Sequence, residues 1–161
     1  MKPHHTINLV LCAVGAIVLF SGAAGMAAHV QDEAPQYDAM NRLVLPADYR
    51  DWVFLSSGLD MSYSENQPMD GSHMFNNVFV PRASYEAFKK TGHWPDKTVL
   101  VLENRGGVTN RSILKHGQIQ TSDIMGLEVH VKDDARFKGG WGFFSYDGKE
   151  PAKQIPTSAS C

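Results

Sequence analysis

The stretch IMGLEVHVKD, residues 124–133, has the clearest secondary-structure pattern in this chain. Apolar and polar side chains alternate along it, with Leu127, Val129 and Val131 on one side and Glu128, His130 and Lys132 on the other. This period of two predicts a β-strand whose apolar side packs on a core. The strand is the starting point for the prediction of a sheet.

Segments on both sides of this strand have similar patterns. Four further strands are predicted, the third more weakly than the others: residues 73–80, 97–104, 111–120 and 141–147. Glycine pairs in RGGVTN (residues 105–110) and DDARFKGG (residues 133–140) are first of all turn glycines. Short connections between consecutive strands favour antiparallel pairing.

Two helices are predicted among these strands. In residues 45–58, Pro46 suits the first helical position, and Tyr49, Trp52 and Val53 follow the i, i+3, i+4 spacing. Residues 81–92 start with a proline and end with a glycine, with two lysines in the last turn. The fold class is therefore α+β: a single domain with a mostly antiparallel, curved β-sheet and two or so short helices.

The N-terminus differs in kind from the rest of the chain. A short positive start is followed by an uncharged apolar run over residues 7–25 and then by small residues, which is the layout of a secretory signal peptide. An uncleaved membrane anchor is the alternative, since the run is just long enough to span a bilayer. We expect a signal peptide over residues 1–27, a polar tail over 28–42, and a domain over 43–161.

Composition excludes some functions and leaves others open. A formal net charge of −2 gives no basic excess of the kind that binds nucleic acid. Glu128 and His130 share one side of a strand and could offer two metal ligands, although such pairs are more often a solvated polar face. Glu128 is a proton acceptor if this face lines a pocket and an ordinary surface carboxylate if it does not.

Longer stretches of the sequence point to a family. LPADYRDWVFLSSGLDMSY (residues 45–63), AFKKTGHWPDKTVLVLE (residues 87–103), GLEVHVKD followed by the GGW turn, and IPTSASC (residues 155–161) occur in one unbroken order. Together they resemble the cytochrome P-460 family, which includes the cytochromes c′-β. The resemblance covers residues 43–161.

The resemblance implies an exported, periplasmic, homodimeric c-type haem protein with a mostly antiparallel β fold. It also implies a nitrogen-oxide or other small gaseous ligand, or hydroxylamine as a substrate, and an electron-transfer partner. In the family, haem attaches through a CxxCH motif, and Cys161 falls on its first cysteine. The second cysteine and the axial histidine would lie beyond residue 161, so no metal ligand is expected within the chain.

Three more positions take their roles from the resemblance alone. Glu128 matches the distal carboxylate that accepts a proton during hydroxylamine oxidation. Leu102 stands where hydroxylamine-oxidising members have a lysine that cross-links to the haem, a bond that leucine cannot make. Asn76 falls near a distal arginine of such members. The leucine argues against an oxidase and favours the gas-binding pocket of the c′-β type.

The position of Cys161 leaves two explanations open: a fragment whose parent continues past residue 161, which we favour, or a natural relic without haem. In either case residues 1–161 alone are expected to carry no covalent haem. The competing hypothesis belongs to another class of function: a haem-free binding or structural module on the same β fold.

Overall fold

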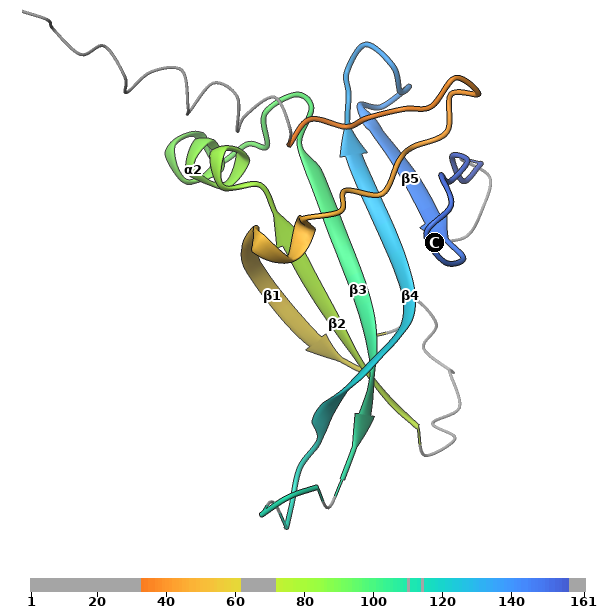
Figure 1. Ribbon diagram of the computed structural model, residues 1–161. Coiled ribbons are helices and arrows are strands. Elements are labelled where there is room, and N and C mark those ends of the chain that lie inside the picture. The colour runs from red at the N-terminus through yellow and green to blue at the C-terminus, as the bar shows by residue number, and fades with distance from the viewer. Residues whose placement is uncertain (1–32, 62–71, 110, 114, 157–161) are drawn as a thin grey trace, which may run out of the picture.

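The computed structural model describes residues 33–61, 72–109, 111–113 and 115–156. Its centre is one antiparallel sheet with the strand order β1-β2-β3-β4-β5 (Figure 1). The elements are a 3-10 turn η1 (Tyr49–Asp51), β1 (Val53–Leu59), β2 (His73–Val80), helix α2 (Arg82–Thr91), β3 (Val99–Val108), β4 (Ile119–Lys132) and β5 (Trp141–Tyr146). The predicted α+β class, with a mostly antiparallel sheet in a single domain, is confirmed.

The helix predicted over residues 45–58 is wrong. Only η1 is helical there, and the chain becomes extended at Trp52, with φ −75° and ψ 178°. The next residues form β1, which pairs with β2 from Val53 opposite Val80 to Leu59 opposite Phe75. Residues 53–55 are β-branched, aromatic and aliphatic, and pairing with a whole strand outweighs the accidental helical spacing of three apolar residues.

The turn predicted at residues 105–110 is also wrong in its first part, because β3 continues through the glycine pair to Val108. Gly107 lies opposite His73 on β2. A Cβ at this position would come within 2.9 Å of the His73 Cβ. Glycine, which has no Cβ, therefore allows β2 and β3 to approach each other closely here. The weak strand predicted over residues 111–120 is limited to its last two residues, since β4 starts at Ile119.

The remaining elements follow the prediction. Helix α2 starts after Pro81 and ends at Gly92, which has a φ of 72°. Gly139 and Gly140 also have positive φ and make the turn before β5. Among the described residues no helix is long and apolar enough to cross a membrane.

The sheet has two different faces. The core face packs under the chain that leads into β1, drawn in orange to yellow in Figure 1. Its buried residues come from three strands and from the segments that cover them: Leu43, Tyr49, Trp52, Val99, Val101, Leu127, Val129, Val131, Phe137, Phe144, Tyr146 and Ala152. This cluster is the hydrophobic core, and it confirms the apolar side predicted for residues 124–133.

The other face, which we call the outer face, has a different composition. Among the residues that strand register places on it are Asn76, Val78, Leu100, Leu102, Glu128, His130 and Phe143. Most of them are half-buried rather than fully buried. All the residues that the sequence resemblance singled out within the described part of the chain lie on this face.

Candidate functional site

Leu102 and Glu128 are direct neighbours on the outer face. They lie opposite each other in the register of β3 and β4. Val78 on β2 lies opposite Leu102, and Ser145 on β5 lies opposite Glu128, so the row runs across four strands. Glu128 is half-buried and lies opposite the apolar Leu102 on the adjacent strand.

Asn76 lies one step along β2 from this row, opposite Asn104 on β3. Its Nδ2 donates a hydrogen bond of 2.8 Å to Asn104 Oδ1. The residue is 5% exposed, and its own Oδ1 is buried with no hydrogen-bond partner. An unpaired buried acceptor is costly, so a group that donates a hydrogen bond to it would be stabilised here.

His130 and Phe143 continue the outer face toward the opposite end of the strands. They lie opposite each other on β4 and β5, with ring centroids 4.7 Å apart and an edge-to-face angle of 79°. Burial lowers the pKa of His130, which keeps the imidazole neutral at neutral pH. In the described part of the chain no group of three His, Cys, Asp or Glu side chains could hold a metal ion.

Cys161 lies outside the described residues. The last described segment runs along β5: Gln154 bridges Phe144, and the Ile155 amide donates a 2.8 Å hydrogen bond to the Phe143 carbonyl. Pro156 is thus close to the outer-face residue Phe143.

A second polar cluster lies on the core face and was not predicted from the sequence. Glu103 is 1% exposed, although it stands in the apolar side of the alternation that begins Val99, Val101. Tyr49 Oη donates a short hydrogen bond to its carboxylate, and Arg50 Nε and Nη2 donate to the same oxygen over 2.8 Å each. Arg105 Nε donates to the other oxygen. A carboxylate at an apolar position of a strand was the signal that could have revealed it.

The charges of this cluster fix its protonation. Burial alone would raise the pKa of Glu103, but hydrogen bonds from Arg105, Tyr49 and Arg50 outweigh it and hold the pKa below its ordinary value. Burial, together with the hydrogen bond to Glu103, raises the pKa of Tyr49 to about 12. Glu103 is therefore an anion and Tyr49 a neutral donor across the neutral range.

Comparison with known proteins gives the family. A search among curated proteins finds no match. The family model described as cytochrome P460 matches residues 46–161, which include every described element of the sheet and the three outer-face positions Asn76, Leu102 and Glu128. The chain therefore belongs to the cytochrome P460 family, a family of haem proteins.

Proposed function

We propose that this chain is an exported c-type haem protein that binds nitric oxide or another small gas over the outer face of its sheet. One observation carries the proposal: Asn76, Leu102 and Glu128, distant in sequence, lie on the same face of adjacent strands. These are the positions to which family resemblance assigns the distal pocket. Location in the periplasm, assembly as a homodimer and exchange of electrons with a partner protein are parts of the same proposal.

The described residues of the outer face fit a haem. Strands are about 4.8 Å apart, so the four strands from β2 to β5 offer a surface about 14 Å wide, which suits a flat macrocycle. Its apolar part is made of residues from three of these strands, β2, β3 and β5: Val78, Leu100, Leu102 and Phe143. The unpaired Oδ1 of Asn76 is a buried polar atom that a ligand or an ordered water can satisfy.

A bound haem would supply an iron atom that coordinates the gas. Cys161 would hold the haem through a thioether bond. The chain's own residues determine what surrounds the bound gas. Leu102 and Val78 present hydrocarbon and exclude water from the surface between β2 and β3. Glu128 can accept a proton from a ligand, and Asn76 Oδ1 can accept a hydrogen bond.

Leu102 favours gas binding over hydroxylamine oxidation. A lysine in this position would place a nucleophilic amine opposite the Glu128 carboxylate, whereas leucine has no atom that can bond covalently to a haem edge. The outer face therefore keeps a proton acceptor without the cross-linking group. Oxidation of hydroxylamine is the less favoured activity.

Haem loading tests the proposal. The protein is expressed with haem-maturation machinery in two versions: residues 1–161, and the same chain extended by four residues that complete CxxCH, namely two non-cysteine residues followed by a cysteine and a histidine. We expect the second version to carry covalent haem, to show a Soret band, and to shift this band when nitric oxide is added. Residues 1–161 are the matched control and should bind none, since a second cysteine and an axial histidine are then missing. Failure of the second version to load haem would favour the haem-free binding module.

A further inference from the structure

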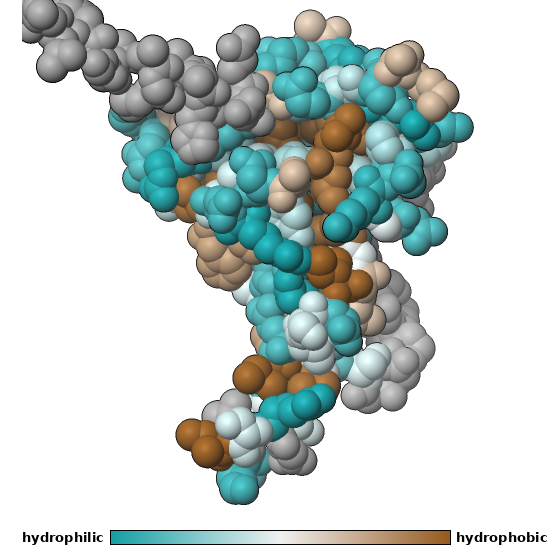
Figure 2. All heavy atoms as spheres, in the orientation of Figure 1, coloured by the Kyte–Doolittle hydropathy of each residue, from teal (hydrophilic) through white to brown (hydrophobic). Residues whose placement is uncertain are grey.

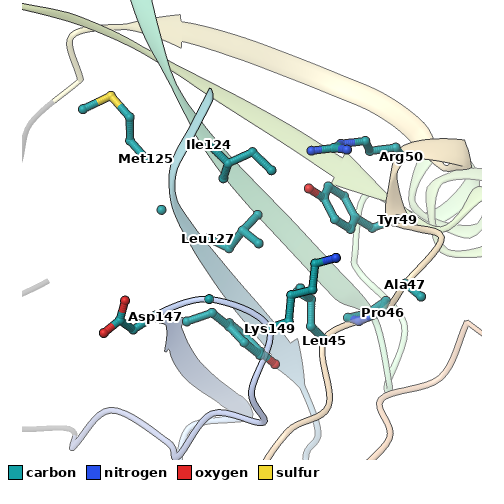
Figure 3. Close-up of a pocket in the computed structure, with 13 residues that line it drawn as sticks. Leu45, Pro46, Ala47, Tyr49, Arg50, Ile124, Met125, Leu127, Asp147 and Lys149 are labelled. Carbon is teal, nitrogen blue, oxygen red and sulfur yellow. The ribbon is translucent and has the colours of Figure 1, made fainter. Parts of the chain in front are cut away.

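The core face has a cleft that the proposed haem site does not use. The cleft has a volume of about 600 Å³ and lies between the chain leading into β1, the middle of β4 and the turn after β5 (Figure 3). Leu127 and Tyr146 line it, and strand alternation places both on the side of the sheet opposite Glu128. A cleft of this size suits a small organic ligand.

One wall of the cleft is hydrocarbon. Leu45, Pro46, Ile124 and Leu127 contribute to it, whereas the Met125 side chain points away from the cleft. Ile124 in this wall is a large apolar side chain and is 41% exposed. Figure 2 shows apolar surface on this side of the molecule over the strands. Burying this surface under an apolar ligand is favourable.

The other wall is cationic. Arg50 lines the cleft with a side chain that is 51% exposed, and the hydrogen bonds to Glu103 hold its guanidinium in one orientation. Such a preordered group binds an anion with less loss of side-chain entropy. Arg105 also pairs with Glu103, so one carboxylate faces two guanidinium groups and the cluster keeps a positive excess.

Lys149 adds a second cation to the cleft. It has no ion-pair partner among the described residues. In Figure 3 its ammonium group points toward Tyr49, whereas the carboxylate of Asp147 points away from both. The cations therefore face the cleft and the nearest acid does not.

We propose that this cleft binds a small amphipathic carboxylate, with the anionic head at Arg50 and Lys149 and the hydrocarbon body against Leu45, Ile124 and Leu127. The site is separate from the outer face, so its occupation does not depend on haem. The occupant is a free monomeric carboxylate. The concave site has cations on one wall and hydrocarbon on the other, so it fits the single carboxylate head and the single hydrocarbon chain of one such molecule.

Isothermal titration calorimetry with octanoate, decanoate and dodecanoate tests the site in the protein as it stands. We expect the dissociation constant to fall about threefold to fourfold for each added methylene group. Decanol, the neutral analogue, should bind at least about tenfold more weakly than decanoate, because it lacks the charge-assisted hydrogen bonds. No binding of any of these carboxylates at millimolar concentration overturns the proposal.

Exposed residues provide variants that should fold. Lys149→Gln should weaken decanoate binding about threefold to tenfold, and Ile124→Glu by about tenfold, since it places a like charge on the apolar wall. Lys153→Gln is the matched control, an exposed lysine in the same segment outside the cleft, and should bind as the wild type does.

Amide NMR shifts give a second readout. Decanoate should shift the signals of Gly126 and Gly148, which line the cleft, and leave Gly107 in place. Equal binding by wild type, Lys149→Gln and Ile124→Glu overturns the proposal, as does binding to vesicles with anionic headgroups without binding to monomeric decanoate. The haem experiment and this one need different preparations, so failure of one leaves the other informative.

Discussion

Leu102 on β3 and Glu128 on β4 lie directly opposite each other on the outer face of the sheet. In the sequence they are separated by the rest of β3, the turn after it and the first part of β4. Only the register of the two strands makes them neighbours. Directly opposite side chains have Cβ atoms about 4.5–5.5 Å apart and interact. The pair places a proton acceptor beside hydrocarbon where the proposed haem would lie.

Replacing Leu102 with lysine should create an ion pair with Glu128. A double-mutant cycle combining Leu102→Lys with Glu128→Gln is expected to give a coupling free energy of about 0.2–1 kcal/mol, which falls in high salt. Urea unfolding measures all four proteins. Leu102→Gln combined with Glu128→Gln is the uncharged control and should show less coupling. Coupling that is absent, or equal in both cycles, is incompatible with a register that places the two residues opposite each other.

Glu103→Gln should destabilise the fold by about 3 kcal/mol. The change leaves the half-buried Arg105 and the more exposed Arg50 without their counter-charge, and it weakens the hydrogen bond from Tyr49. Chemical denaturation measures the difference. Glu150→Gln, at an exposed position, should change the unfolding free energy by less than about 0.5 kcal/mol. Similar effects of the two changes would show that the Glu103 cluster does not stabilise the fold.

The stabilisation by Glu103 should depend on pH in the acid range. The pKa of its carboxyl is lowered in the folded protein, so its contribution is complete above the unfolded value of about 4.3 and is lost as the pH falls through the folded value. The difference in unfolding free energy between wild type and Glu103→Gln should therefore be constant from about pH 6 to 7 and shrink below about pH 4. A difference that grows in acid would contradict the lowered pKa.

Asn76 and Asn77 provide a matched pair of neighbours on opposite faces. Asn77 is 4% exposed and fully paired: its Oδ1 accepts from Ser57 and Gln120, and its Nδ2 donates to Gln120. Asn76 has an unpaired Oδ1 and one hydrogen bond to Asn104. Asn77→Val should cost about 2 kcal/mol, and Asn76→Val less than about 1 kcal/mol, because it also removes an unsatisfied buried acceptor.

Thermal and urea unfolding of the two variants, without haem, give this comparison. Each variant introduces valine at one of two neighbouring positions in β2. The effect of valine on strand propensity is therefore similar in both and cancels when their unfolding free energies are compared. An equal cost for the two changes would mean that Asn76 Oδ1 has a partner in solution.

Local patterns predicted those parts of the fold that local chemistry determines. A proline before it and a glycine after it mark α2, and the alternation of residues 127–132 marks the inner and outer sides of β4. The helix predicted at residues 45–58 failed because β1 exists only by pairing with β2. The strength of that pairing is not encoded in the segment itself.

The candidate sites likewise depend on contacts between distant segments, which local patterns do not predict. Glu103 meets Tyr49 and Arg50 through contacts between residues more than 50 positions apart, so no local pattern could bring them together. The cleft beside them likewise combines three distant segments. Asn76, Leu102 and Glu128 could be selected by resemblance to a family, but their presence on one face follows from the register of three strands.

Paramagnetic NMR of the haem-loaded protein tests the central claim most directly. In the version with a completed haem motif, ferric iron should broaden or shift the methyl signals of Leu102 and Val78, on the outer face, far more than those of Ile124 and Leu45 in the cleft on the core face. The zinc-porphyrin form is the diamagnetic control. Strong effects on Leu102 and weak effects on Ile124 are the result that the proposed haem position predicts. Strong effects on Ile124 and Leu45, with Leu102 unchanged, would contradict it.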